Sequence, residues 1–297
     1  MAQVYRRSSG RGWRLRQQSL QLWQAWRSEL EARGHHLPWR PGLLQLAQTD
    51  QDLQAQARLA AERQAQGMPL RLLNREELES LQPAVPEAAL GGLLSERDGQ
   101  LDPLPAMAAL RSDALRVGLQ ERAAAAQRLE RRGGGGVPGW RLHLCSGETL
   151  DQDWLVISAG LGSPALLEPL GHHRPQTPVL GQALELQLSD AVPDPSSWPG
   201  SISWGGVNLV PRPGRRLWLG ASVEPGGGPA DAQALAQLRS LDGQAPAWLQ
   251  NAQVIRHWQG LRARPEGRPA PLLEPLEPGL LLASGHYRNG VLLAPAS

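Results

Sequence analysis

The end of the chain constrains the fold more than any other stretch. A strand-like run, Gly279 to Ser284, leads into a turn bracketed by Gly285 and Gly290, and an apolar run from Val291 to Ala294 follows. Glycines allow backbone N–H groups to approach a ligand closely. The arginine within this turn offers a planar, bidentate clamp for an anion. The sequence therefore predicts a strand that ends in a ligand-binding turn.

Helical and strand-like runs alternate along the rest of the chain. Asn74 followed by Glu77 has the pattern of a capping box at a helix start. Apolar spacing predicts helices over residues 15–30, 50–66, 74–81, 105–117 and 230–241, and strands over 43–47, 140–144, 154–158, 183–188, 207–210, 217–219 and 254–258. This mixture predicts an α/β or α+β fold with an antiparallel sheet in the middle of the chain.

Composition excludes several classes of protein. The 297 residues are enough to bury a sizeable core in one or two domains. The formal net charge is +2, with acidic residues interspersed among the arginines, which argues against a nucleic-acid partner. Cys145 is the single cysteine, so an internal disulfide framework is excluded and a reducing, cytoplasmic location is expected. No apolar run has the length of a membrane span.

Two glycine-rich segments match dinucleotide-binding patterns. The run from Gly134 to Gly139 fits G-x-G-x-x-G, but it leads into a strand-like run instead of a helix, so we interpret it as a hairpin loop. The run from Gly160 to Ala165 fits the looser G-x-G-x-x-A and follows the predicted strand 154–158. The carboxyl end of such a strand is where open α/β sheets bind ligands. A plain strand-to-turn corner is the alternative interpretation.

Other polar groups give weaker indications. His35–His36 and His172–His173 are adjacent pairs whose side chains point to different faces, so we predict no metal site. Arg262 follows a predicted strand and is either a solvated or salt-bridged side chain or a ligand-binding group. The residues alone leave both roles of Arg262 open.

Several motifs, in order along the chain, resemble one family. Residues 258–262, Trp-Gln-Gly-Leu-Arg, resemble its W-x-G-L-R-P stretch, and residues 285–290, Gly-His-Tyr-Arg-Asn-Gly, resemble its G-H-x-R-N-G string. Further matches lie at residues 90–93, 98–103, 178–182, 208–212 and 219–222. Over nearly its whole length the chain resembles the glycine oxidases, in the D-amino-acid-oxidase-like group of FAD-dependent oxidoreductases.

This resemblance implies a two-domain FAD-dependent amino-acid oxidoreductase fold with a substrate domain built on an antiparallel sheet. An incomplete FAD-binding domain is then expected to consist of residues 1–36, 90–175 and 261–297. The substrate domain is expected to consist of residues 37–89 and 176–260. The resemblance assigns the substrate carboxylate to Arg262 and Arg288, with Asn208 beside it, and implies no catalytic side chain. For FAD it implies contacts with Ala159, Gly160, His286, Tyr287, Asn289, Gly290, Val291 and Leu292.

The chain departs from the family pattern at several places. Asn208 stands where the family has a substrate-site tyrosine, and Ala263 and Arg264 follow Arg262 where the family has a proline. The sequence begins inside the family's first long helix, without the Gly-rich βαβ unit, and it ends where the final helix starts. We therefore expect a fragment, or one half of a split enzyme.

The implied reaction is oxidative deamination of glycine or a small D-amino or N-methyl amino acid to the oxo acid. FAD would be the cofactor, O₂ the oxidant and H₂O₂ a product, and the implied pathway is thiamine thiazole synthesis. One alternative is a non-catalytic truncated remnant, or one half of a split oxidase, which alone holds no FAD. The other alternative is an arginine-rich nucleic-acid binder. The implied protein partners are a second copy of this chain or a second chain that supplies the missing unit.

Overall fold

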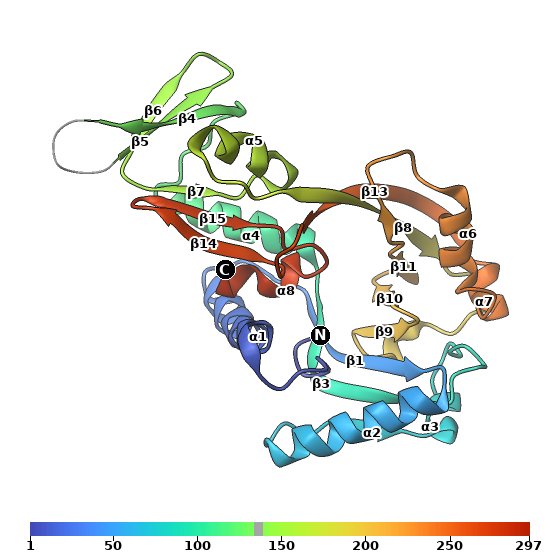
Figure 1. Ribbon diagram of the computed structural model, residues 1–297. Helices are drawn as coiled ribbons and strands as arrows, with labels where there is room; N and C mark the ends of the chain where they lie inside the picture. The colour runs from blue at the N-terminus through green and yellow to red at the C-terminus, as the bar shows by residue number, and fades with distance from the viewer. Residues whose placement is uncertain (134–138) are drawn as a thin grey trace.

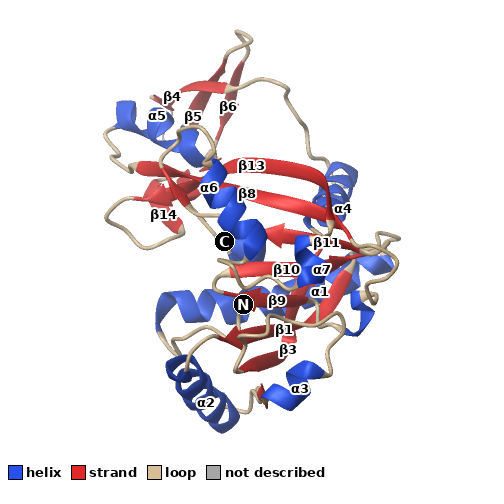
Figure 2. Ribbon diagram, turned by 90° about the vertical axis from the view of Figure 1, so that its right-hand side faces the viewer, coloured by secondary structure: helices blue, strands red, loops and turns tan. Residues whose placement is uncertain are grey.

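The computed structural model describes residues 1–133 and 139–297. Its largest part is a mixed, mainly antiparallel sheet, whose strands run one above the other in Figure 2. The strand order is β12-β8-β11-β10-β9-β1-β3-β2. Strand β13 stands outside this order and also pairs with β8. The strands are β1 Trp39–Ala47, β2 Arg71–Leu73, β3 Gly91–Leu101, β8 Gln176–Gln187, β9 Ser201–Trp204, β10 Val207–Arg212, β11 Arg216–Gly220, β12 Glu224–Pro225 and β13 Gln253–Pro265.

Two smaller sheets lie at the other end of the molecule (Figure 1). One has the order β14-β15-β7, and the other has the order β4-β5-β6. β15 pairs with β7 in parallel, so the turns that follow these two strands leave from the same edge. The strands of the two smaller sheets are β4 Ala126–Arg132, β5 Gly139–Leu144, β6 Thr149–Gln152, β7 Leu155–Ile157, β14 Leu272–Glu277 and β15 Leu280–Ser284.

Two of the helices begin at residues that form a capping box. The Thr49 and Asn74 side chains accept from the backbone N–H groups of Asp52 and Glu77, and both caps form the reciprocal capping box. The described helices are α1 Gly10–Ala32, α2 Asp50–Ala65, α3 Arg75–Glu79, α4 Pro103–Arg116, α5 Ser163–Leu167, α6 Ala232–Ser240, α7 Ala247–Gln250 and α8 Gly290–Leu293. None of them is both long and apolar enough to cross a membrane.

The main core lies on one face of the large sheet. Because side chains alternate along a strand, the inner leucines of β8, β10 and β11 point to one face, where α6 and α7 cover them (Figure 1). This cluster includes Leu184, Leu186, Leu209, Leu217, Leu219, Leu238, Leu241 and Leu249. The alternate residues of the same strands face the other way.

The predicted mixed α/β class and the antiparallel middle sheet are confirmed. The strands of the structure differ from the predicted strands at several places. The strand predicted to end at Trp258 continues to Pro265, because its pairing with β8 extends across Gly260. β3 was not predicted, since Gly91, Gly92 and the charged residues 96–98 have low strand propensity. The hairpin loop predicted at Gly134 to Gly139 falls mainly on residues 134–138, which lie outside the described residues.

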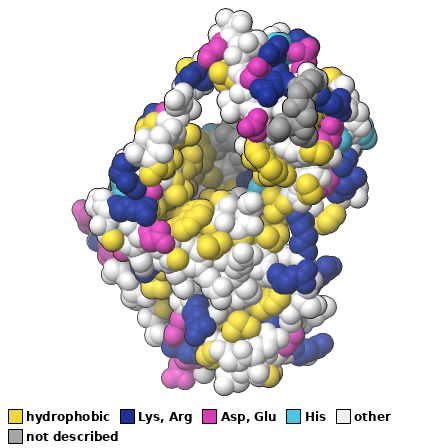
Figure 3. Space-filling model, turned by 90° about the vertical axis from the view of Figure 1, so that its left-hand side faces the viewer, with side chains coloured by type: hydrophobic (Ala, Val, Ile, Leu, Met, Phe, Trp, Pro, Cys, Tyr) yellow, Lys and Arg dark blue, Asp and Glu magenta, His cyan; other side chains and the backbone are white. Residues whose placement is uncertain are grey.

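The strand predicted over 154–158 forms as β7, but it is not buried on both faces. Among the described residues β7 pairs with β15 on one edge, and Val156 is 58% exposed. Figure 3 shows hydrophobic side chains gathered around a hollow on this side of the molecule. Residues 90–175, predicted to belong to the FAD-binding domain, contribute β3, which pairs with β1 in the large sheet. The predicted domain boundaries stay predictions.

Candidate functional site

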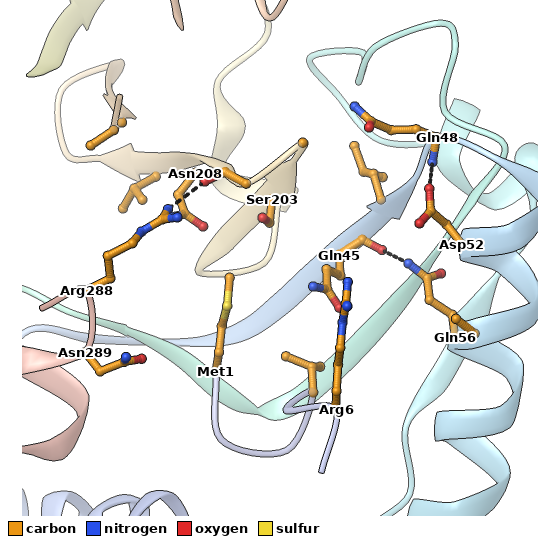
Figure 4. A pocket seen from close by; sticks show the side chains of 18 of the residues that line it. Met1, Arg6, Gln45, Gln48, Asp52, Gln56, Ser203, Asn208, Arg288 and Asn289 are labelled. Atoms are coloured by element: carbon orange, nitrogen blue, oxygen red, sulfur yellow. Dashed lines mark hydrogen bonds between the residues drawn. The ribbon is translucent and has the colours of Figure 1, made fainter. Parts of the chain in front are cut away.

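A cavity of about 1120 Å³ opens on the side of the large sheet opposite α6 and α7. Its walls come from β1, β8 to β11, β13, the turn at 287–289, the first residues of the chain and helix α2 (Figure 4). Asn208, Arg262, Tyr287, Arg288 and Asn289 are among its lining residues. The fold thus brings the three predicted substrate-binding side chains to one cavity.

Arg262 is held against the sheet face. The residue lies on β13, pairs with Val179 of β8, and is half-buried. Its guanidinium lies over Gly181, where a Cβ would overlap it. Its Nη1 donates to the carbonyl oxygens of Ser222 at 3.1 Å and Leu180 at 3.4 Å. A glycine at 181 is therefore required for the observed position of this arginine.

A network of polar side chains lies behind Arg262. Glu224 accepts from the Ser222 hydroxyl, from Gln182 Nε2 at 2.9 Å and from the backbone N–H of Asp231 at 2.9 Å. Burial alone would raise the pKa of the Glu224 carboxyl, but these hydrogen bonds and the nearby Arg262 charge hold it below its ordinary value. Glu224 therefore stays ionised and offers a fixed negative charge near Arg262.

Arg288 reaches the cavity from a turn instead of a strand. Tyr287, just before it, has φ 54°, a left-handed conformation uncommon outside glycine. The Arg288 side chain is exposed, and its Nη2 donates to the Gly206 carbonyl oxygen at 3.1 Å, beside Asn208 (Figure 4). The turn thus places a second guanidinium opposite the sheet.

The two arginines bring like charges to one cavity. Burial lowers the pKa of the Arg262 guanidinium, and the Arg288 charge lowers it further, while Tyr287 and Glu224 act in the opposite direction. An anion between the two guanidinium groups would relieve this repulsion and accept hydrogen bonds from both. The arrangement is therefore suited to a carboxylate.

The residues predicted to contact FAD lie mostly outside this cavity lining. Ala159 and Gly160 form the turn after β7, and His286 to Leu292 form the turn and short helix after β15. The Ser284 hydroxyl at the end of β15 donates to the Gly160 carbonyl oxygen at 3.4 Å, so the two turns are neighbours. Burial and the charge of Arg11 lower the pKa of His286, which favours its neutral form.

The first residues of the chain form part of the cavity wall. The buried Asp98 carboxylate accepts from the backbone N–H groups of Ala2 at 2.5 Å and Gln3 at 2.9 Å. Arg63, which is fully buried, donates to the carbonyl oxygens of Gln3 at 2.9 Å and Tyr5 at 2.5 Å. Two buried charged side chains therefore fix a segment that has no regular structure of its own.

Sequence reasoning missed several residues that shape the site. Gly181 lies within the predicted motif 178–182, but its contact with Arg262 depends on the pairing of β8 with β13. Glu224 lies two residues after the 219–222 motif, and a carboxylate at this distance from Ser222 was a signal that could have been used. Among the described residues no group of His, Cys, Asp or Glu side chains could hold a metal ion.

A sequence profile of one family matches residues 1–297, and the family is described as FAD dependent oxidoreductase, DAO. The chain belongs to this family. The predicted resemblance and the fold class that it implied are thereby confirmed. Its relatives include enzymes named glycine oxidase, so this chain is a glycine-oxidase-like member of an oxidoreductase family.

Three relatives illustrate the similarity. The chain is 36% identical to the glycine oxidase of Pseudomonas putida over 151 residues, which are 50% of this chain and 40% of that enzyme. It is 31% identical to the bifunctional protein ThiO/ThiG of Synechocystis over 234 residues, 75% of this chain and 33% of that protein. The matched regions thus span less than half the length of either relative. The crystal structure of a glycine oxidase from Geobacillus kaustophilus has a TM-score of 0.85 and 26% identity, covering 99% of this chain and 79% of that chain.

Proposed function

We propose that this chain takes part in the FAD-dependent oxidation of an amino acid whose carboxylate lies between Arg262 and Arg288. The observation that supports it is the convergence of these two arginines, one from a strand and one from a turn, on a single cavity. The resemblance predicts glycine or a small D-amino or N-methyl amino acid as the substrate. The position of the arginines supports the amino-acid part of that prediction.

The turns after β7 and β15 fit the part of FAD that the resemblance assigns to them. They lie side by side at the carboxyl ends of two parallel strands, where open α/β sheets bind ligands. Gly160 has φ +55°, and a Cβ there would meet no atom within 4 Å, so its backbone faces open space. Residues 159–160, 286–287 and 289–292 would hold FAD there.

The roles of this chain's residues follow from the carboxylate clamp. Arg262 and Arg288 would fix the carboxylate and thereby orient the Cα–H bond. In oxidative deamination the amino acid loses a hydride from Cα and a proton from its amino group to become an imine, which water converts to the oxo acid and ammonia. When bound, FAD supplies the hydride acceptor, and O₂ takes up the two electrons to give H₂O₂.

The test compares amino acids with the amines that lack only the carboxylate. The purified chain is supplied with FAD, and O₂ consumption and H₂O₂ release are measured with a panel of amino acids and their decarboxylated counterparts. We expect the amino acids to be oxidised and the amines to be poor substrates. Equal rates for both would contradict the clamp. A chain that retains no FAD and oxidises no amino acid would favour the alternative, a non-catalytic module.

The expected protein partner, a second copy or a chain that supplies a Gly-rich unit, stays a prediction. So does the role in thiamine thiazole synthesis. Both are tested by gel filtration and by complementation of a thiamine-requiring strain that lacks its own glycine oxidase.

A further inference from the structure

The strand register shows which residues are neighbours on the sheet face beside the two arginines. Asn208, Gly220, Ala183 and Trp258 are paired across four neighbouring strands and form one row. Two residues further along each strand, on the same face, the next row is Val210, Trp218, Glu185 and Arg256. In the opposite direction, two residues before Ala183, lies Gly181 with the Arg262 guanidinium over it.

The middle of the first row, Gly220 and Ala183, forms a floor that carries almost no side chain. Gly220 and Ala183 are neighbours on it, since a Cβ on Gly220 would come 3.0 Å from the Ala183 Cβ. Asn208, at the side of this floor, is the residue that replaces the family's tyrosine, and it is smaller. All three line the cavity, so the space above the floor belongs to the same cavity as the two arginines.

The floor ends against an aromatic wall. The Trp218 and Trp258 rings meet edge to face, with centroids 5.7 Å apart, and both line the cavity. Arg212 stacks on Trp218 at 3.9 Å and Arg256 on Trp258 at 4.8 Å from the ring centroids.

The charges behind this wall are already paired. Arg212 binds Asp102, and Arg256 Nη2 lies 3.0 Å from Glu185 Oε2. The wall therefore presents fixed apolar rings to the cavity without adding an unpaired charge. Trp258 is nonetheless 36% exposed, which leaves apolar surface available for a ligand to cover.

The distance from clamp to wall sets the size of the occupant. The clamp end is marked by Gly181, which lies below the Arg262 guanidinium. The wall end is marked by Glu185, which is paired with Trp218. The two residues are four positions apart on β8, which is roughly 13 Å of extended strand. An amino acid held at the arginines therefore has a side-chain path along Ala183 and Gly220 to the two tryptophans. Glycine has no side chain to cover that path.

We propose that the substrate is an amino acid with an aromatic side chain, which lies over Ala183 and Gly220 and ends against Trp218 and Trp258. This rests on the proposed function, because it takes the substrate carboxylate to lie on Arg262 and Arg288. Burial of a ring against the tryptophans adds to the affinity that the carboxylate provides. It should strengthen binding by roughly tenfold to a hundredfold over a carboxylate without a ring.

The test uses two carboxylates that cannot be oxidised at an amino-bearing carbon, acetate and 3-phenylpropanoate. Their dissociation constants for the purified chain, in the presence of FAD, are measured by calorimetry and by the change in tryptophan emission. We expect 3-phenylpropanoate to bind roughly tenfold to a hundredfold more tightly than acetate. Arg262→Ala should weaken the binding of both.

Three variants locate the ring. Ala183→Leu fills the floor, so it should weaken 3-phenylpropanoate binding more than acetate binding and thereby reduce the preference between them. Trp258→Leu, which alters a partly exposed side chain, should reduce the preference without disturbing the fold. Ala236→Leu, the same change as at 183 on the exposed surface of α6, should alter neither affinity.

The outcomes separate the two proposals. Equal affinities for the two carboxylates, both lost in Arg262→Ala, would overturn the aromatic side chain and leave the clamp standing. A preference that survives both Ala183→Leu and Trp258→Leu would also overturn it, because the ring would then lie elsewhere. Failure of the wild-type chain to bind either carboxylate, or an unaffected Arg262→Ala, would overturn the proposed function and this inference with it.

Discussion

The two arginines of the cavity are held in opposite ways. Arg262 lies on a 13-residue strand, with its guanidinium packed over Gly181 and bonded to two carbonyl oxygens. Arg288 lies on a turn, is exposed, and donates to one carbonyl oxygen, that of Gly206. A side chain that is already fixed loses little conformational entropy when it binds a ligand, whereas a mobile one loses more. The same residue type is therefore expected to contribute unequally.

Arg262→Ala should have the largest effect on ligand binding. A charge-assisted hydrogen bond from a fixed guanidinium contributes about 1.5–3 kcal/mol, so carboxylate affinity should fall roughly tenfold to a hundredfold. The measurement is the dissociation constant of a carboxylate ligand by calorimetry. Arg264→Ala, two residues along the same strand and exposed, is the control. If Arg264→Ala weakens binding while Arg262→Ala does not, the clamp is assigned to the wrong arginine.

Gly181→Ala tests whether pre-organisation is the reason. The new Cβ would overlap the Arg262 guanidinium, which must move away although its charge remains. We expect a loss of affinity close to that of Arg262→Ala, about 1.5 kcal/mol or more. Gly260→Ala, opposite Gly181 on β13, places a Cβ with no atom within 4 Å and should change little. A Gly181→Ala variant with unchanged affinity would show that the arginine does not need this position.

Glu224→Gln removes the charge behind Arg262 and keeps the side-chain shape. We expect a loss of about 0.5–1.5 kcal/mol in the free energy of unfolding at neutral pH, from the hydrogen bonds to the carboxylate. Because the pKa of Glu224 is lowered in the folded chain, this contribution is complete above the ordinary glutamate pKa of about 4.3. It disappears as the pH falls through the lower folded value.

Urea unfolding of both forms as a function of pH measures this difference. The stability gap between the wild-type chain and Glu224→Gln should close in acid. A gap that widens in acid would contradict the ionised state of Glu224, and a gap absent at neutral pH would mean that the network contributes nothing to stability.

Arg288→Ala should have the smallest effect of the four. An exposed guanidinium on a turn contributes about 0.2–1 kcal/mol to an ion pair, so carboxylate affinity should fall by a few-fold at most. Arg288→Lys, which retains the charge, should recover much of that loss. The same calorimetric titration as for Arg262 checks it at low and high salt. A loss equal to that of Arg262→Ala would remove the distinction between the two arginines.

Much of the local structure was predictable from short stretches of sequence. The capping box at Asn74 and Glu77 forms as expected, because a cap depends on residues three positions apart. The apolar run predicted β7 as a strand, but such a run does not show what covers the faces of a strand, and Val156 of β7 is 58% exposed. The continuation of β13 to Pro265 was also missed, because pairing with β8 overrides the low strand propensity of Gly260.

The family motifs, the order of most elements and the choice of the two arginines follow from the order of amino acids alone. The surroundings of those arginines follow from the way the strands pair and pack. Gly181 lies under Arg262, Glu224 stands behind it, and the floor of Ala183 and Gly220 leads to the tryptophans. These surroundings depend on register, because a shift of one residue in the pairing of β8 with β11 or β13 would turn each of these side chains to the other face of the sheet.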